Sequence, residues 1–254
     1  MDDEAFVDEL ATRLAGLPTV EAVALGGSRA QGTHRPDSDW DLAIYYRGDF
    51  DPNELRALGY PGEVSQLGGE GSVFGGGAWL RVDGRAVDVL FRDLADIEAE
   101  LAAAEAGRVR IEALSFHLAG VPSYLVIAEL ALCRVLRGEL PRPAFPAALR
   151  RSASAAWWGR ARLHLDYARN AHASAGRAAQ CLAMLTVAAS QTSHAVLAAR
   201  GEWITNEKTL LDRAGLRGID WIVTSVSPDA DGLRAACDAI DALCSDAVLA
   251  ASRS

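Results

Sequence analysis

Residues 25–46 constrain the fold more than any other part of the chain. A short β-branched, apolar run at 20–25 ends at Gly26-Gly27, and Asp39-Trp40-Asp41 opens a second apolar run. Short apolar runs that end at a glycine are typical of buried strands. The pattern therefore predicts two strands joined by a glycine turn, with polar residues at the turn and at the start of the second strand.

The glycine turn is the first candidate binding feature. Ser28 lies where we expect a turn or a helix to begin, directly after Gly27, and Arg29 follows it. Unpaired backbone N–H groups at such a point favour an anion. The turn therefore predicts that Gly27 and Ser28 hold the phosphates of a nucleotide, with Arg29 neutralising charge beside them.

The two aspartates are the second candidate feature. Along a strand alternate side chains share a face, so Asp39 and Asp41 point to one side while Trp40 points into a core. Neighbouring carboxylates repel each other unless a cation lies between them, and such hard oxygen ligands suit Mg²⁺ bound together with substrate phosphates. The pair predicts a metal site; the alternative is that these are ordinary turn residues after Pro36.

Together these residues resemble the nucleotidyltransferase superfamily typified by polymerase beta and the antibiotic nucleotidyltransferases. The family pattern is an apolar residue, Gly-Ser, roughly ten residues, then Asp-apolar-Asp-apolar. This chain supplies Leu25, Gly27-Ser28 and Asp39-Trp40-Asp41-Leu42, and the specific match extends over residues 25–92. The resemblance implies ATP or another NTP as substrate, two Mg²⁺ ions, and a third acid on a neighbouring strand.

Asp88 matches the position of that third acid. Residues 78–82 and 85–91 alternate apolar with polar around Asp83-Gly84, a dipeptide that closes two-residue hairpins. Asp88 lies within an apolar-Asp-apolar sequence in the second arm. By the resemblance it completes the metal ligands with Asp39 and Asp41; the alternative is an edge-strand aspartate that faces water.

The rest of the chain is helical in pattern. Strands first and helices afterwards predict an α+β fold, with a mixed-sheet nucleotidyltransferase domain and its flanking helices at 1–110 and an all-α helical bundle domain at 111–254. The apolar spacing, with proline and glycine at several ends, predicts helices at 2–17, 51–58, 93–106, 122–137, 146–172, 175–200, 206–214 and 228–250.

Two charged residues of the second half are candidates for the site. Glu129 stands in an otherwise apolar helix, where it either pairs with an arginine such as Arg134 or faces a site as a general base. Lys208 is the one lysine among 25 basic residues, and Asn206 before it is expected to cap a helix that has Lys208 in its first turn. Relatives with a helical second domain often place a lysine on the triphosphate, so the resemblance implies that role for Lys208.

The acceptor side is less defined. Residues 61–77 hold seven glycines among seventeen residues and form either a plain surface loop or a lid over the site. Four acids near possible pocket positions would suit a polycation such as an aminoglycoside: Glu63, Glu70, Glu129 and Asp166.

Composition excludes several classes of protein. A net charge of −9 and a pI near 5.1 argue against a nucleic-acid surface. The four cysteines lack metal-ligand spacing, and no uninterrupted apolar run reaches the roughly 18 residues of a membrane span. The N-terminus lacks the pattern of a signal peptide. We therefore expect a cytoplasmic protein, monomeric or homodimeric, with no nucleic-acid or membrane partner.

The sequence thus predicts a metal-dependent nucleotidyltransferase that moves a nucleoside monophosphate, AMP from ATP in the first instance, to a hydroxyl of a small molecule and releases pyrophosphate. Either Asp88 or Glu129 would deprotonate that hydroxyl. One alternative is an antitoxin-type enzyme that adenylylates a toxin partner. The other is a non-catalytic nucleotide-binding module that has kept the fold.

Overall fold

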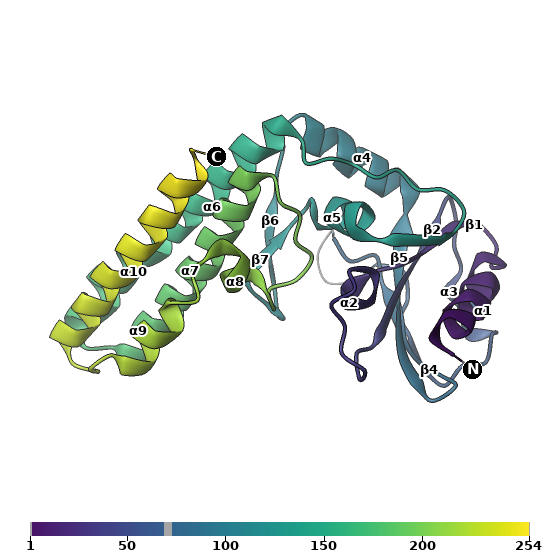
Figure 1. Ribbon diagram of the computed structural model, residues 1–254, viewed down its shortest axis with the longest axis horizontal. Coiled ribbons are helices and arrows are strands. Elements are labelled where there is room, and N and C mark those ends of the chain that lie inside the picture. Colours follow the sequence, from purple (N-terminus) through teal and green to yellow (C-terminus); the bar gives the residue numbers. More distant parts are fainter. Residues whose placement is uncertain (1, 69–72, 254) are drawn as a thin grey trace. The chain divides into compact units, whose positions relative to one another are not determined.

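A computed structural model describes residues 2–68 and 73–253 of the chain (Figure 1). Contacts divide it into two compact units, the first comprising Met1–Ala102 and Ser123–Ala144 and the second comprising Ala103–Pro122 and Phe145–Ser254. The division differs from the single boundary at 110/111 that the sequence suggested, because the chain returns to the first unit after Pro122.

The first unit is built on a six-stranded mixed sheet in the order β3-β4-β5-β2-β1-β8. Only β2 and β5 pair in parallel; the other neighbours are antiparallel. Its elements are α1 (Asp3–Ala15), β1 (Val20–Leu25), α2 (Gly27–Ala30), β2 (Trp40–Tyr46), α3 (Pro52–Arg56), β3 (Gly62–Val64), β4 (Gly77–Val82), β5 (Arg85–Asp93), α5 (Leu125–Leu132) and β8 (Arg134–Arg137), together with most of α4 (Leu94–Glu105).

Local sequence signals account for several of these boundaries. The Asp2 carboxylate caps α1 by accepting the Ala5 N–H at 2.8 Å, and Asp51 caps α3 in the same way ahead of a proline at the first helical position. Asp83 and Gly84 both have positive φ, 48° and 78°, as a two-residue turn between β4 and β5 requires. The predicted hairpin is confirmed.

The sheet has one face in the core and one face that carries the acids. Trp40, Leu42 and Ile44 alternate with Asp41 along β2 and are buried against α1, where the Phe6 and Trp40 rings meet edge to face with centroids 5.2 Å apart. On β5 and β4 the same face is buried, with Val87, Val89, Phe91, Ala78, Leu80 and Val82 in one cluster. The predicted alternation holds, and it leaves Asp41 and Asp88 on the other face.

The prediction of a single helix at 122–137 was wrong. α5 ends at Leu132, and Cys133 takes an extended conformation that leads into β8. β8 pairs with β1, opposite Leu25 and Ala24, and so supplies hydrogen-bond partners to an edge that would otherwise be open. Helical periodicity in the sequence could not detect this pairing, because the two strands are more than a hundred residues apart.

The second unit is mainly helical but includes a β6-β7 hairpin, which the run of helices predicted after residue 93 did not contain. Its elements are β6 (Ile111–Leu114), β7 (His117–Pro122), α6 (Ala147–Tyr167), a π-helical turn (Ala168–His172), a 3-10 turn (Ala173–Ala175), α7 (Ala178–Arg200), α8 (Leu210–Ala214), α9 (Ile219–Ser225) and α10 (Ala230–Ala251). The helix expected at 206–214 begins only at Leu210.

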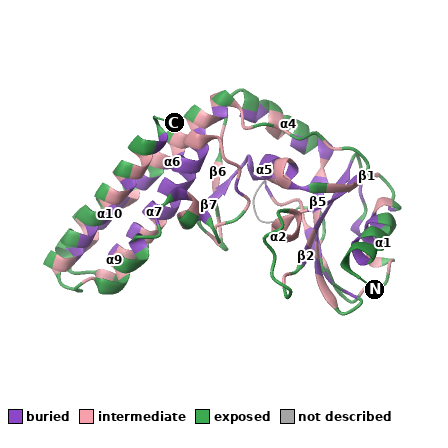
Figure 2. Cartoon of the chain, viewed as in Figure 1, coloured by how far each residue is buried: buried purple, intermediate pink, exposed green. Residues whose placement is uncertain are grey.

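α7 is the core helix of this unit. It is long and apolar enough to span a membrane by composition, with a mean hydropathy of 1.3 over its best window, but 72 % of that window is buried by neighbouring elements. Figure 2 shows buried residues along the later turns of α7. Packing within the unit therefore accounts for its composition. The four cysteines are free, buried thiols.

Candidate functional site

The glycine turn lies directly on Asp41. The Gly26 N–H donates to the Asp41 carbonyl at 2.7 Å, and Gly27, which has a φ of 59°, opens the four-residue helix α2. A Cβ built on Gly27 would lie only 1.7 Å from Asp41 Oδ2. Glycine is required here for two reasons, its left-handed backbone and the carboxylate against its Cα. The structure thus brings the predicted phosphate turn, including Ser28, next to one predicted metal ligand.

Asp88 lies beside Asp41 on the same face of the sheet. The two residues are opposite each other in the parallel β2–β5 register, and both are partly exposed. Asp39, one residue before β2, is exposed. Burial raises the pKa of Asp88, and the negative charge of Asp39 raises it further. The three predicted aspartates are therefore neighbours, and their mutual repulsion favours a bound cation.

The donor set fits Mg²⁺ in its chemistry. Within residues 2–68 and 73–253, no three His, Cys, Asp or Glu side chains are arranged tightly enough to hold a metal by themselves. Mg²⁺ does not need such a cage, because it usually binds one or two carboxylates and completes its shell with water and substrate phosphates. Asp41 and Asp88 offer carboxylates of that kind in adjacent strands.

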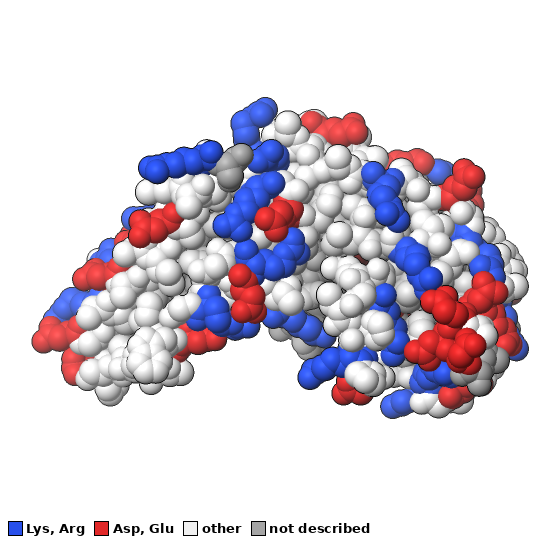
Figure 3. All heavy atoms as spheres, viewed as in Figure 1, with Lys and Arg blue, Asp and Glu red and all other residues white. Residues whose placement is uncertain are grey.

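The Arg29 guanidinium is engaged by other residues of the first unit. Its Nε and one terminal nitrogen donate to the Ser38 carbonyl at 3.2 and 2.9 Å, and the guanidinium stacks over the Trp40 ring at 4.0 Å. Its other terminal nitrogen lies 3.4 Å from Asp3, in the acidic first turn of α1, over which acidic side chains gather in Figure 3. The side chain is only 8 % exposed. This geometry holds the segment that leads into Asp39 and gives no support to phosphate binding by Arg29.

Glu129 is held in a buried ion pair. Arg92 donates to both of its carboxylate oxygens, at 2.8 and 3.0 Å, and the Arg92 side chain is 2 % exposed. Burial works to lower the pKa of Arg92, but the Glu129 carboxylate and its hydrogen bonds outweigh it and the pKa is raised. The sequence anticipated an arginine partner but named Arg134, which instead approaches Glu4 at 3.4 Å. Nothing in the described residues brings Glu129 to the three aspartates.

Lys208 lies in the second unit on a turn before α8. Its N–H donates to the Asn206 side chain at 3.0 Å, so the predicted cap exists, but it closes a local turn and the helix starts two residues later. The Lys208 side chain is exposed. Its contact with a triphosphate stays a prediction.

The glycine-rich segment is partly a strand. Glu63 lies in β3, opposite Trp79 of β4, and is exposed. Glu70 falls outside the described residues. Asp166, the remaining acid proposed for the acceptor, lies on α6 and pairs with Arg162 at 3.5 Å. Among the three of these acids that the structure describes, Glu63 is the one that the sheet register aligns with Asp88, through Trp79.

Sequence reasoning missed two residues near the site, Arg92 and Trp79. Arg92 could have been suspected because Glu129 needs a cation within an apolar helix. Trp79 could have been found from the alternation in β4, since it shares a face with Arg81 and not with the buried Ala78 and Leu80.

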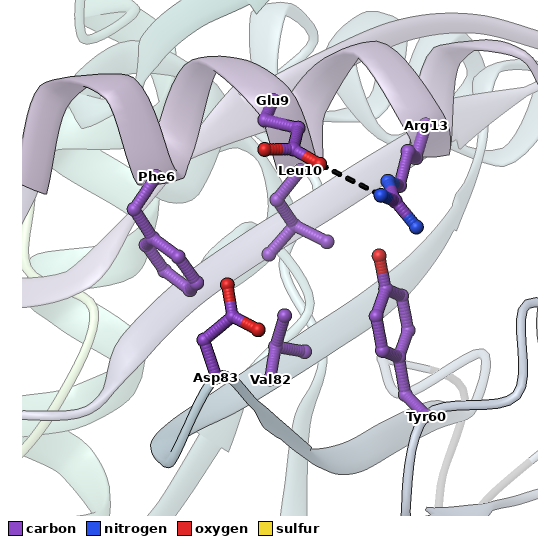
Figure 4. Close-up of a pocket in the computed structure, with 7 residues that line it drawn as sticks. All are labelled: Phe6, Glu9, Leu10, Arg13, Tyr60, Val82 and Asp83. Carbon is purple, nitrogen blue, oxygen red and sulfur yellow. Dashed lines mark hydrogen bonds and ion pairs between the residues drawn. The ribbon is translucent and has the colours of Figure 1, made fainter. Parts of the chain in front are cut away.

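A small pocket elsewhere in the first unit is not a rival site. It lies between α1 and the β4–β5 hairpin, and Figure 4 shows the Glu9–Arg13 ion pair and the Tyr60 hydroxyl at its rim. Phe6, Leu10 and Val82 line its floor, and none of the predicted site residues contributes to it.

One comparison with known proteins concerns the first unit. Residues 6–72 match the family model of the nucleotidyltransferase domain, a range that includes the glycine turn, Asp39 and Asp41. No curated protein matches the chain. A solved structure, that of a nucleotidyltransferase-like protein from Exiguobacterium sibiricum 255-15, aligns with 99 % of this chain and 78 % of its own, at 10 % sequence identity and a TM-score of 0.46.

The matched range includes Gly27 and Asp41, which lie against each other. Asp88 lies beyond that range in the sequence, and the β2–β5 register places it opposite Asp41, on the face of the sheet turned away from the core. Residues 6–72 of the chain thus match the nucleotidyltransferase domain family.

Proposed function

We propose that this chain transfers a nucleoside monophosphate from an NTP to a hydroxyl group of a small cationic molecule and releases pyrophosphate. ATP is the nucleotide that we expect as the donor. The observation that carries the proposal is the row formed by the Gly27 turn, Asp41 and Asp88, with Asp39 beside it. A turn with free N–H groups suits phosphate oxygens, and neighbouring carboxylates suit a cation that accompanies them.

Asp39, Asp41 and Asp88 would hold the divalent ions. When bound, such ions neutralise charge on the entering and leaving oxygens of an in-line displacement. The backbone of Gly27 and the Ser28 hydroxyl would orient the terminal phosphates. The proposal rests on the residue types and on their adjacency. A metal ion needs neighbouring carboxylates, and the triphosphate that it accompanies needs backbone N–H donors close to that ion.

Asp88 is our choice for the general base over Glu129. Both oxygens of the Glu129 carboxylate accept hydrogen bonds from the buried Arg92 guanidinium, so this carboxylate is held in an ion pair and is not available to an acceptor hydroxyl. Arg92 is four residues from Asp88 along β5, roughly 13 Å at about 3.3 Å per residue. Asp88 is partly exposed and in the same row as Asp41.

The acceptor is proposed to be a cationic molecule of the aminoglycoside kind. The net charge of −9 favours the approach of a cation, and Glu63 is exposed on β3, which β4 and β5 separate from Asp41 on β2. We propose that Lys208 assists at the triphosphate. Replacement of Lys208 by methionine should then raise the KM for ATP several-fold at unchanged stability, and an unchanged KM would remove Lys208 from the site.

The decisive experiment replaces Asp39 and Asp41 singly with asparagine, which keeps their shape. Incubation with Mg²⁺, α-labelled ATP and a panel of aminoglycosides should give labelled product with the wild type, and each substitution should lower the rate at least roughly 100-fold. Asp37→Asn is the matched control, since Asp37 is an exposed turn residue two positions earlier.

Two outcomes would overturn the proposal. Undiminished turnover in the Asp41→Asn variant would show that the acids are not the site. Tight Mg-ATP binding without product against any acceptor would favour the non-catalytic module over the enzyme.

A further inference from the structure

Four side chains form a line across the face of the sheet that is turned away from the core, called the open face below. Glu63 is opposite Trp79, Trp79 is opposite Asp88, and Asp88 is opposite Asp41 in the register of β3, β4, β5 and β2. Residues directly opposite each other in adjacent strands project to the same face, with Cβ atoms about 5 Å apart. Trp79 therefore lies immediately beside the proposed general base, on the side away from Asp41.

Folding does not account for Trp79. Its side chain is 51 % exposed, whereas its chain neighbours Ala78 and Leu80 are buried in the core on the opposite face. Among the described residues it takes part in no ring–ring or cation–π contact. An indole is the largest apolar side chain, and leaving half of it in water forgoes much of the stabilisation that burial would give. A flat apolar surface is thus presented next to Asp88.

The direction of the reaction decides which substrate reaches this surface. In an in-line displacement the entering oxygen approaches opposite the leaving one. On the proposed function the leaving pyrophosphate is held at the Gly27 turn, which lies against Asp41 on the β1 side of the row. The acceptor hydroxyl must then come from the other side of Asp88, where Trp79 and Glu63 stand.

We propose that Trp79 and Glu63 form the acceptor subsite, and that they select a saturated ring bearing an ammonium group and a hydroxyl. The ring lies on the indole, whose π face attracts cations and polarised C–H groups, and the ammonium pairs with the exposed Glu63 carboxylate. This assignment rests on the proposed function for the identity of the reacting hydroxyl, but the binding of the ring can be measured without turnover.

The test uses two probes of the same ring size. 2-Deoxystreptamine carries two ammonium groups on a cyclohexane ring, and myo-inositol is a neutral polyol on the same ring. Calorimetric or saturation-transfer titration of the full chain should show that the diamine binds at least about 10-fold more tightly than inositol. Trp79→Ala and Glu63→Gln should each raise the Kd for the diamine by about 5- to 30-fold. Trp79→Phe should retain most of the affinity.

Mg-ATP binding supplies the second readout. The Kd for Mg-ATP should change less than about 2-fold in Trp79→Ala and in Glu63→Gln. Arg81→Ala, on the same exposed face of β4, is the control and should leave the Kd of both ligands unchanged. A weakened Mg-ATP affinity with unchanged diamine affinity would assign the indole to the nucleobase and overturn the proposal. So would equal affinity for the two probes, or no diamine binding to the wild type at millimolar concentration.

Failure of the subsite and failure of the function are separable. If the Asp41→Asn variant loses turnover but Trp79→Ala leaves diamine binding intact, the subsite is wrong and the nucleotidyl transfer stands. If the wild type transfers no nucleotide at all, yet the diamine still depends on Trp79 and Glu63, the proposed function is wrong while the ring site remains.

Discussion

Acidification should destabilise the helical unit through one histidine, His194 on α7. Its side chain is buried, its ring stacks on Trp157 with centroids 4.3 Å apart and planes 12° apart, and its Nε2 has no hydrogen-bond partner among the described residues. Burial, and then the nearby His117, lower the pKa of His194 to about 3. An imidazole in this place is kept neutral in the folded protein.

The size of the effect follows from linkage. An unfolded histidine has a pKa of about 6.5, so between pH 6.5 and 3 the unfolded state binds a proton that the folded state does not. Stability is therefore complete above about pH 7 and is lost as the pH falls through this window. At about 1.36 kcal/mol per tenfold difference in proton affinity, the whole loss is about 5 kcal/mol near pH 3, and about 2 kcal/mol of it is present at pH 5.

The measurement is urea unfolding at pH 8 and pH 5, followed by circular dichroism at 222 nm, which reports mainly the helices. Other titrating groups contribute to both proteins, so the informative quantity is the difference between wild type and His194→Phe, a variant that keeps an aromatic ring against Trp157. The pH-dependent loss should shrink by about 2 kcal/mol in that variant and stay as in wild type in His34→Gln, whose side chain is exposed. An equal loss in wild type and His194→Phe would refute the reasoning.

Three further predictions concern the first unit. Glu129→Gln leaves the buried Arg92 guanidinium without its carboxylate and should lower the free energy of unfolding by about 3–5 kcal/mol in urea titrations, with a loss below about 1 kcal/mol contradicting the ion pair. Gly27→Ala puts a Cβ into the Asp41 carboxylate at a φ of 59°; melting should show a loss of about 1–2 kcal/mol, and kcat should fall much further, whereas retained kcat would separate the turn from catalysis. Arg29→Met should reduce stability and kcat together, because the carbonyl ahead of Asp39 loses its donors; a rise in the KM for ATP at full stability would instead return Arg29 to the phosphates.

Local pattern was enough to predict the central strands and the acids. The two-residue period along β2 and β5 decides which side chains face the core, and Trp40, Leu42 and Val89 follow it. The Asp83-Gly84 turn fixes the hairpin because both residues must take positive φ. With the hairpin and the period set, Asp88 can only face the side opposite the core, and the parallel β2–β5 pairing then places it beside Asp41.

Features that depend on distant pairing were not predictable in this way. β8 is a strand because β1 has an edge to fill, and Glu129 finds Arg92 across 37 residues while the sequence-adjacent candidate Arg134 points elsewhere. Lys208 shows a different limit. The Asn206 side chain can cap a helix or close a local turn with the same hydrogen bond, and the sequence alone does not distinguish the two.

The ion pair also explains where the open face ends. Asp88, Leu90 and Arg92 share one face of β5, yet Asp88 is partly exposed while Arg92 is buried beneath α5 by Glu129. Tyr45, opposite Arg92 on β2, is buried in the same place, and its pKa is raised by burial and by Glu129. α5 thus covers the later part of the face and leaves the earlier part, with Asp41, Asp88 and Trp79, to solvent. We infer that α5 sets the extent of the candidate site, and that Glu129 bears on the site by holding α5 over this part of the sheet through its ion pair with Arg92.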